Sequence, residues 1–542
     1  MRRWNGWGDE SVIYNLSSHA EGYLRERLGP GKPSRDVKLE EFSPPPSRLP
    51  VHPLVETETE TRIRHSRGES FPDLVALRSG RIEAFPDGIS FPGRESEVEG
   101  LLSYARTVGA RIIPRGGGTS VVGGVNPIPG EQPILVVDMG QMGRLQDMDE
   151  ESRLATFGTG VRGPWIEAQL RGQGYTLGHF PQSFEYSTLG GWISTRSAGQ
   201  QSLLYGRIED TFKGGRMITP QGTMELPAFP ASAAGPDLRQ FVLGSEGRLG
   251  LITSATVRIQ LLPERERFWG IMFPSWEEGI AAIREIAQST LPMSMLRLSD
   301  PEETNSQLHL TLNPYVRRLL DGLLARRGLR QEKCLMMLGA TGQSSTVRKA
   351  HTRTRTLTRE YGGVVVGDVA GREWRNNRFR LPYLRNTLWE KGWAVETLET
   401  ATTWSALIPT ARAVLQALRT ALEDERVLAM AHVSHVYPTG ASLYFTFFFR
   451  LAVDPEATLE RWQTLKSAAL ETIVEHGATL SHQHGVGTDH LPYMEKEKSA
   501  PGLSMLEALR KNVDPEGMLN PGKLLPDAPI ARQNSRADRD FL

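Results

Sequence analysis

Cysteine is nearly absent from this chain of 542 residues, which contains only Cys334. One cysteine excludes an intramolecular disulfide, an iron–sulfur cluster held by several cysteines and a four-cysteine zinc site, and it is typical of a reducing compartment. The sequence also lacks any run of about 18 apolar residues, so no membrane-spanning helix is predicted. Because no apolar run follows the arginines at positions 2 and 3, we expect no secretory signal.

Net charge is absent as well, because 63 Lys and Arg residues balance 63 Asp and Glu residues. The balance conceals a segregation, since residues 317–385 hold 16 basic and 5 acidic residues, a local excess of +11. Such an excess indicates a surface or cavity that meets anions, although a pair of solvated amphipathic helices would explain the same count. The stretch has no aromatic–basic recognition motif, so nucleic acid is not an expected partner.

The length is about three times that of a typical single domain, so several folded units are expected. Residues 1–60 are predicted as an N-terminal extension and linker. Residues 61–263 form the first unit, in which short strands and helices predict an α+β fold. Residues 264–453 repeat strand–helix–strand modules, which predict a sheet covered by helices. Residues 454–525 form a C-terminal segment, and the polar tail 526–542 is predicted to be disordered.

Capping boxes indicate where two of the helices begin. Ser96 with Glu99 matches the pattern in the first unit, and Ser275 with Glu278 matches it in the second. Gly109 suits the end of the first of these helices, because glycine readily adopts the left-handed conformation found there.

The sharpest local motif is a glycine-rich loop that follows a predicted strand at Arg111–Pro114. The loop Arg115–Ser120 (RGGGTS) lets backbone N–H groups converge on an anion, and its two hydroxyls add donors. It has Val121 where a Rossmann fingerprint needs glycine, and it does not match a Walker loop. A plain glycine-rich turn is the alternative. Two further loops that join glycines to polar residues, 181–199 and 244–250, strengthen the case for a long dinucleotide.

An aromatic strand is predicted over residues 441–449. Alternation places a row of large apolar side chains on one face and Tyr444, with Thr446 and Phe448, on the other. A phenol on such a partly polar face can exchange a proton with a substrate, provided that neighbouring groups lower its pKa. A core tyrosine satisfied by one hydrogen bond is the alternative.

His482 and His484 stand two residues apart, so an extended backbone would place both on one face. Such a pair can bind substrate, transfer protons or ligate a metal ion. No third metal ligand is evident, because His490 lies beyond an intervening glycine loop, and no metal site is predicted.

Several of these segments together resemble a known superfamily. The RGGGTS loop and the segments 181–192, 244–250 and 514–523 are similar to the FAD-binding fold of the vanillyl-alcohol oxidase type. Within it, the resemblance is closest to the alkyldihydroxyacetonephosphate synthase (alkylglycerone-phosphate synthase) family, and it extends from Trp4 to Lys523. The segments that single out this family are 4–8, 184–192, 194–196, 205–210 and 481–487.

The resemblance implies an α+β fold with a two-subdomain FAD-binding domain and a cap domain built on a helix-covered, mainly antiparallel sheet. FAD would be held noncovalently, because Thr119 stands where some members tether the flavin through a histidine. The residues that the resemblance assigns to FAD are Pro114, Arg115, Gly116, Gly117, Gly118, Thr119, Ser120, Pro181, Ser187, Thr188, Gly190, Gly191, Ser194, Thr195, Ser197, Ala198, Gly199, Glu246, Gly250 and Ile252.

The resemblance also assigns roles around the substrate. Tyr444 matches the acid/base tyrosine of the family, and His482 and His484 match two of its three successive histidines. Gln483 replaces the middle histidine, which removes a titratable group but keeps an amide that can hydrogen-bond near the substrate. The two matching arginines offer planar forks for anions. Arg385 is expected to contact a substrate phosphate. Arg297, on a predicted strand, is expected to bind substrate in the active site, with a buried structural arginine as the alternative.

The implied activity is that of an FAD-dependent alkyl transferase of ether-lipid biosynthesis. It exchanges the acyl group of 1-acyl-dihydroxyacetone phosphate for a long-chain alcohol and releases fatty acid. An FAD-linked oxidase or dehydrogenase of a 2-hydroxy acid or alcohol is the alternative, which Gln483 favours and the family-specific segments oppose. The expected partners are these substrates, an anionic membrane surface and a second copy of the chain.

The expected location is cytoplasmic, or peripheral on the cytoplasmic face of a membrane. The last residues, Asp540-Phe541-Leu542, do not form the Ser-Lys-Leu peroxisomal address. Leucines lie among the arginines of the basic stretch, a pattern that suits contact with anionic lipids.

Overall fold

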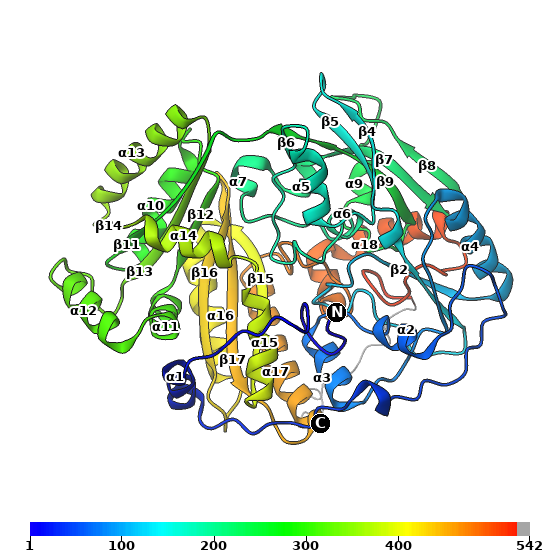
Figure 1. Cartoon of the computed structure of the whole chain (residues 1–542), viewed down its shortest axis with the longest axis horizontal. Coiled ribbons are helices and arrows are strands. Elements are labelled where there is room, and N and C mark those ends of the chain that lie inside the picture. Colours follow the sequence, from blue (N-terminus) through cyan, green and yellow to red (C-terminus); the bar gives the residue numbers. More distant parts are fainter. Residues whose placement is uncertain (528–542) are drawn as a thin grey trace, which may run out of the picture.

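The computed structural model describes residues 1–527, which form two lobes (Figure 1). The glycine-loop lobe (residues 88–261) holds a three-stranded sheet, a five-stranded sheet and a short pair of strands, β6 (Tyr175–Thr176) with β10 (Gln260–Leu261). The large-sheet lobe (residues 265–475) holds one sheet of seven strands. Residues beyond 475 return to the glycine-loop lobe, where Val513 and Leu519 join its hydrophobic clusters. The tail predicted to be disordered lies, from residue 528 onward, outside the described residues.

A three-stranded parallel sheet begins the glycine-loop lobe. Its order is β1 (Gly88–Ser90), β3 (Ile134–Asp138) and β2 (Arg111–Arg115). Helix α4 (Glu95–Val108) buries Val98, Leu101 and Ala105, three positions that share one helical face. The parallel strand pairs bring the ends of β2 and β3 together, so the glycine loop emerges at a fixed edge of the sheet.

The start of α4 differs from the sequence prediction. The helix begins at Glu95 with Arg94 as N-cap, so Ser96 lies inside the first turn and the predicted capping box is wrong. Glu97, in the first turn, reaches back past the start of the helix, where its Oε2 accepts a hydrogen bond from the Gly93 N–H at 2.8 Å. The predicted stop at Gly109 is confirmed, with φ at 67°.

The second small sheet is antiparallel and has five strands. Its order is β4 (Leu145–Asp149), β5 (Leu154–Gly158), β9 (Leu251–Arg258), β7 (Phe212–Thr219) and β8 (Gly222–Leu226). The helices associated with the glycine-loop lobe are α2 (Thr59–Arg64), α5 (Gly163–Arg171), α6 (Leu189–Thr195), α7 (Ser202–Tyr205), α8 (Ile208–Thr211), α9 (Arg239–Val242) and α18 (Met494–Val513). Helix α3 (Phe71–Ser79) instead buries Phe71, Leu74 and Val75 in the hydrophobic cluster of the large sheet.

The large sheet is antiparallel throughout. Its order is β14 (Val364–Gly367), β11 (Arg265–Phe273), β13 (Cys334–Gly342), β12 (Met295–Ser299), β16 (Leu428–Val436), β17 (Gly440–Arg450) and β15 (Trp393–Thr403). Helices α10 (Trp276–Gln288), α13 (Ser344–Glu360), α16 (Trp404–Thr420) and α17 (Pro455–Glu475) pack on one face. This confirms the helix-covered antiparallel sheet, and Ser275 caps α10 as predicted by accepting from the Glu278 N–H.

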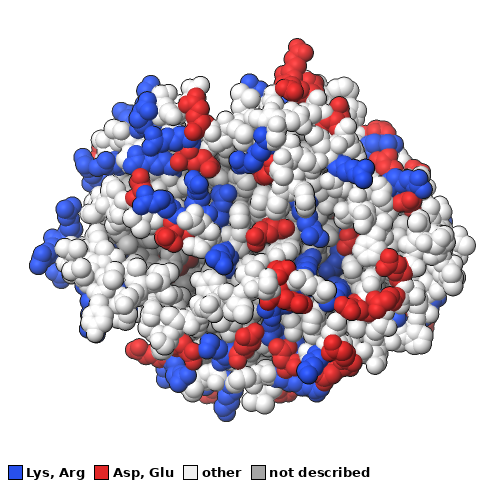
Figure 2. Space-filling view, in the orientation of Figure 1, with Lys and Arg blue, Asp and Glu red and all other residues white. Residues whose placement is uncertain are grey.

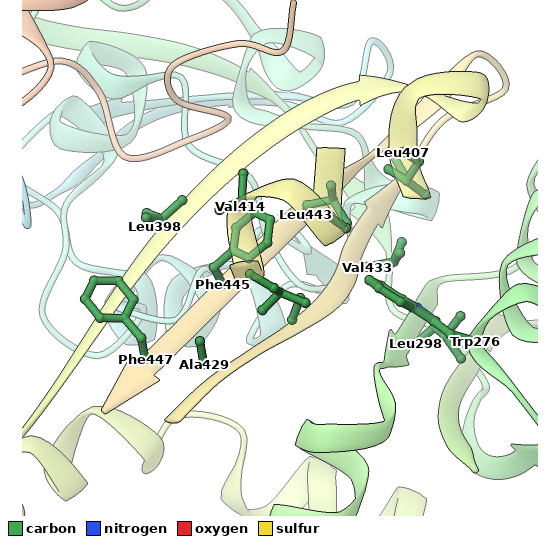
Figure 3. Close-up of a cluster of buried hydrophobic side chains, with 14 of the residues drawn as sticks. Trp276, Leu298, Leu398, Leu407, Val414, Ala429, Val433, Leu443, Phe445 and Phe447 are labelled. Carbon is green, nitrogen blue, oxygen red and sulfur yellow. The ribbon is translucent and has the colours of Figure 1, made fainter. Parts of the chain in front are cut away.

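Alternation along β17 divides its side chains between the two faces as predicted. Phe445, Phe447 and Phe449 are fully buried against the helices, where Figure 3 shows the first two among aliphatic side chains of β15, β16 and α16. Each such burial contributes about 1.5–3 kcal/mol. Tyr444 and Thr446 point to the opposite face and line a cavity between the lobes.

The predicted N-terminal linker contains a helix, α1 (Ser18–Leu28), which packs beside the large sheet (Figure 1). Leu24 and Leu28 join Leu384 and Leu388 of α15 (Leu384–Glu390) in one apolar cluster. The four-residue spacing of these leucines is a helical signal that the prediction of an extension and linker overlooked. Among residues 1–527, no helix combines the length and the apolar character that crossing a bilayer requires.

Candidate active site

The candidate site is a cavity of about 350 Å³ between the two lobes. The glycine loop, α6 and the segment 246–252 form its wall on one side, and strands β12, β15, β16 and β17 form the other. It therefore joins the predicted dinucleotide loops to the face of the large sheet that carries Tyr444.

The glycine loop can form this wall only without side chains. A Cβ on Gly116 would lie 2.2 Å from Thr188 Oγ1, and a Cβ on Gly117 would lie 1.9 Å from the carbonyl oxygen of Tyr186. Gly118 has φ at 64°, in the left-handed region that glycine adopts without strain. The loop backbone thus borders the cavity directly, as the pyrophosphate of a dinucleotide requires.

Nineteen of the twenty residues assigned to FAD line this cavity. Gly199 is the exception, because it packs behind the wall, where a Cβ would lie 2.6 Å from the Phe180 nitrogen. The Arg115 side chain donates to the carbonyl oxygen of Arg67 at 3.0 Å. A continuous wall of glycines and small hydroxyl residues fits an elongated cofactor such as FAD.

Glu246 ties the two sides of the site together. Its carboxylate accepts hydrogen bonds from the Val486 N–H at 2.6 Å and the Gly487 N–H at 2.8 Å. Burial raises the pKa of Glu246 to about 7, while these N–H donors oppose that shift. The contact fixes the segment that carries His484 against the loop that carries Glu246.

Tyr444 lies between two histidines in the cavity. Its ring stacks on His432 with centroids 4.9 Å apart, and the ring of His484 meets it edge-on at 6.0 Å. Burial raises the pKa of Tyr444 to about 12, and the charge of Glu399 adds to that effect. The condition of a lowered pKa is therefore not met in this structure, and the phenol is neutral near pH 7. Burial lowers the pKa of both histidines, so they also favour the neutral form.

Strand register explains which side chains surround Tyr444. Glu399 of β15 and His432 of β16 are its direct cross-strand partners. Side chains directly opposite each other lie on the same face of a sheet and about 5 Å apart. Neither partner is predictable from the sequence, because pairing between distant strands leaves no local signal.

Arg297 and Arg385 both line the cavity but differ in their partners. Arg297 donates to Glu303 at 2.7 Å and contacts His432 Nδ1 at 3.2 Å, so its charge is already paired. Arg385 donates through Nη1 to the Glu69 carbonyl oxygen at 2.7 Å. Its buried Nε and Nη2 have no hydrogen-bond partner within residues 1–527. Arg385 is therefore the arginine better prepared for an incoming anion.

The predicted extended segment around the histidines is wrong. Residues 482–484 form consecutive bends, so His484 lines the cavity and His482 lies outside it. His482 Nε2 is 2.6 Å from the Tyr437 hydroxyl, and its Nδ1 is 3.3 Å from Glu399 Oε1. His482 is thus held by its neighbours and has no surface on the cavity.

Gln483 links the two lobes through its amide. Its Nε2 donates to Glu399 Oε2 at 2.6 Å, and its Oε1 accepts from the Ala198 N–H at 3.1 Å. Both ends of the amide are therefore used, one on the large sheet and one on the predicted FAD loop. Gln483 also lines the cavity, where it was expected to meet substrate.

The fold brings two residues of the types that bind metal ions, Glu399 and His435, close to His482, which the sequence pattern did not reveal. Ligand atoms of Glu399, His435 and His482 all lie within 4.8 Å of one another. The three side chains could hold a metal ion by their types and spacing. His435 of this cluster lines the cavity directly. Glu399 is also the hydrogen-bond acceptor of Gln483, which gives the cluster a second contact with the cavity lining.

Comparison with known proteins places the chain among flavoenzymes. The family model "FAD binding domain" matches residues 86–226, and "FAD linked oxidases, C-terminal domain" matches residues 262–524. The alkyldihydroxyacetonephosphate synthases of Dictyostelium discoideum and Trypanosoma brucei brucei are each 30% identical to it. The alignments cover 98% and 99% of this chain and 94% of each relative.

A solved structure agrees with these relatives. A crystal structure of alkyldihydroxyacetonephosphate synthase superposes with a TM-score of 0.83 at 28% identity, and the match covers 96% of this chain and 99% of the other. The resemblance read from the sequence motifs, the α+β fold and FAD as cofactor are thereby confirmed. The chain belongs to the alkyldihydroxyacetonephosphate synthase family.

Proposed function

We propose that this protein is an FAD-dependent alkylglycerone-phosphate synthase that replaces the acyl group of 1-acyl-dihydroxyacetone phosphate with a long-chain alcohol and releases fatty acid. The observation that carries the proposal is a single cavity that holds Tyr444, His484 and Arg385 opposite the FAD loops. Two guanidinium nitrogens of Arg385 have no hydrogen-bond partner in the described part of the chain. When bound, FAD supplies the reactive isoalloxazine ring, and the exchange of acyl for alkyl leaves its redox state unchanged overall.

Tyr444 and its neighbouring histidines remove the proton from the substrate carbon. Because Tyr444 is a neutral phenol, it can accept that proton only after it passes its own proton to a nearby base. His432 and His484 are neutral imidazoles packed against the Tyr444 ring. Either serves as that base once substrate binding brings one of its nitrogens within hydrogen-bond reach of the phenol. The same groups return a proton at a later step.

An assay for the alkyl product distinguishes the proposed synthase function from the oxidase alternative. Purified protein with bound FAD is supplied with 1-acyl-dihydroxyacetone phosphate and a radiolabelled long-chain alcohol. We expect labelled alkyl-dihydroxyacetone phosphate and free fatty acid in equal amounts. Absence of the alkyl product, together with anaerobic bleaching of the flavin by a hydroxy acid, would establish the oxidase function instead.

Replacing Arg385 by alanine is expected to weaken binding of the phosphorylated substrate. A hydrogen bond to a charged group contributes about 1.5–3 kcal/mol, so KM for acyl-dihydroxyacetone phosphate should rise about tenfold to a hundredfold. Steady-state kinetics measure the effect, and the KM for the alcohol should change little. Arg372→Ala on α14 (Asp368–Asn377) is the control, because that exposed arginine lies outside the cavity. An unchanged KM in Arg385→Ala would assign the phosphate to another group.

Helix α12 (Pro314–Ala325) is the part of the basic stretch best suited to meet an anionic membrane. Tyr315, Val316, Leu319 and Leu323 are all more than half exposed, and Leu324 anchors the helix by burial. Arg317 and Arg318 lie within the helix, and Arg326 and Arg327 follow it. Figure 2 shows basic side chains around this end of the molecule. Exposed leucines flanked by arginines are typical of helices that lie in a membrane interface.

Introducing charge on this surface should weaken vesicle binding. We expect the double variant Leu319→Glu/Leu323→Glu to bind phosphatidylserine vesicles more than about tenfold less tightly, since burying a leucine contributes about 1.5–3 kcal/mol. Co-sedimentation measures the change, and Val51→Glu serves as the control because Val51 is fully exposed outside α12. Equal binding of the double variant and the wild type would exclude α12 as the docking surface.

A further inference from the structure

A second cavity, of about 520 Å³, adjoins the glycine loop. Arg115 and Gly116 line both cavities, so the loop lies between them. The remaining lining comes from residues 2–4, from residues 64–69 at the end of α2 and beyond it, from Leu77 and Phe91, and from the segments 138–143 and 160–165 that follow the bodies of β3 and β5. Figure 2 shows basic side chains within a hollow near the centre of the molecule, the region where Figure 1 places the N-terminus.

Arginine dominates the lining of this second cavity. Two carboxylates face it, and both have partners: Glu69 lies 3.6 Å from Arg2, and Asp138 lies 3.4 Å from His65. The six arginines are Arg2, Arg3, Arg64, Arg67, Arg115 and Arg162. The cavity therefore carries a clear excess of positive charge.

Three of the arginines, Arg3, Arg115 and Arg162, make no ion pair within residues 1–527. Arg3 has a buried Nε without a hydrogen-bond partner among these residues. Arg115 donates only to backbone carbonyl oxygens, and burial together with the charge of Arg2 lowers its pKa to about 10. Burial and Arg2 lower the pKa of Arg162 in the same way. Neighbouring cations in a shared cavity repel each other, and a bound anion would relieve that repulsion.

We propose that this cavity is a second anion site, which binds a phosphate monoester group separately from the substrate phosphate at Arg385. Guanidinium groups match phosphate because their planar forks donate two parallel hydrogen bonds. The same group could reach the cavity on a soluble metabolite or as the headgroup of phosphatidic acid. This site goes beyond the proposed reaction, because it lies outside the cavity that holds Tyr444.

Two contacts connect the second site to the active site. Arg2 Nη1 donates to the carbonyl oxygen of Gly117 at 2.5 Å, so an anion that draws Arg2 away would act on the FAD loop. Glu69 faces the second cavity with its carboxylate, while its carbonyl oxygen accepts from Arg385. Occupancy of the second site is therefore expected to change the KM for the phosphorylated substrate as well.

Calorimetry on the FAD-loaded protein tests the proposal, with glycerol 3-phosphate as the soluble probe. We expect two sites per chain in the wild type, one of which disappears in Arg385→Ala and the other in Arg3→Gln/Arg162→Gln. The single variant Arg162→Gln should weaken the second site at least tenfold. Arg353→Gln on α13 is the control, because Arg353 is an exposed arginine that lines neither cavity.

A second measurement distinguishes a soluble phosphate monoester from the headgroup of phosphatidic acid. Vesicles with and without phosphatidic acid are co-sedimented with the wild type and with Arg3→Gln/Arg162→Gln. Binding of glycerol 3-phosphate at the second site identifies a soluble ligand, and binding only to vesicles that contain phosphatidic acid identifies the headgroup. The proposal fails if neither probe binds there, if the arginine variants bind as the wild type does, or if the second site appears only after FAD is removed.

Discussion

Tyr444→Phe is expected to retain FAD and lose turnover. General acid–base catalysis contributes about 10²–10⁴-fold, so kcat for alkyl product should fall by about that factor. KM should change little, because the ring and its stacking on His432 remain. Flavin absorbance after gel filtration reports the bound cofactor, and labelled alcohol incorporation reports turnover.

A buried tyrosine outside the cavity gives the matched control for this variant. Tyr205 is 3% exposed and lines neither cavity, so Tyr205→Phe removes a hydroxyl from the interior without touching the reaction. It should keep wild-type kcat. Wild-type turnover in Tyr444→Phe, or equal losses in both variants, would show that the Tyr444 hydroxyl has no specific part in proton transfer.

The features of Tyr444 that depend on local sequence were predictable, and those that depend on packing were not. A period of two along β17 places Tyr444 on the face opposite the buried phenylalanines, and the structure confirms that face. Its pKa depends on burial and on Glu399, which lies 45 positions earlier in the chain. A sequence pattern carries no information on either quantity, so only the structure shows that the condition of a lowered pKa is not met.

The cofactor loops were predictable for a related reason. Gly116 and Gly117 must be glycine because atoms of residues 186 and 188 occupy the space of a Cβ, and such a requirement leaves a visible run in the sequence. The histidines show the opposite case. An alternation rule placed His482 and His484 on one face, but bends over residues 482–484 separate them. Glu399 determines where His482 lies, and only the fold brings the two together.

Glu399→Gln is expected to reduce kcat on the order of tenfold to a hundredfold, as removal of a partner that orients a functional group does. The carboxylate accepts from the Gln483 amide and faces His482 Nδ1, so it favours the proton on that nitrogen. His482 Nε2 is then free to accept from the Tyr437 hydroxyl. The Glu399 carboxylate faces two donors, the Gln483 amide and His482 Nδ1. An amide at position 399 has only one oxygen, so its N–H₂ group must face one of these two donors. If that donor is Gln483, its amide loses the hydrogen bond that helps to hold it against Ala198.

The charge of Glu399 also predicts a pH dependence of stability. Burial alone would raise the pKa of Glu399, but contact with His482 and His435 outweighs burial and holds that pKa well below its usual range. A carboxyl with a depressed pKa stabilises the folded state above the unfolded value of about 4.3, and this contribution is lost as the pH falls further. The difference in unfolding free energy between wild type and Glu399→Gln should therefore be constant from pH 8 to about 6 and shrink below about pH 4.3.

Two measurements separate a positioning role of Glu399 from a purely structural one. Nitrogen-15 chemical shifts should show His482 protonated at Nδ1 in the wild type and a mixture of tautomers in Glu399→Gln, while Glu399→Asp restores the wild-type pattern and part of kcat. A fall in stability alone would change neither the tautomer nor the slope of kcat against pH. If Glu399→Gln keeps the Nδ1 tautomer and wild-type kcat, the buried carboxylate serves the packing of β15, and the chemistry depends on Tyr444 and its two neighbouring histidines, His432 and His484, alone.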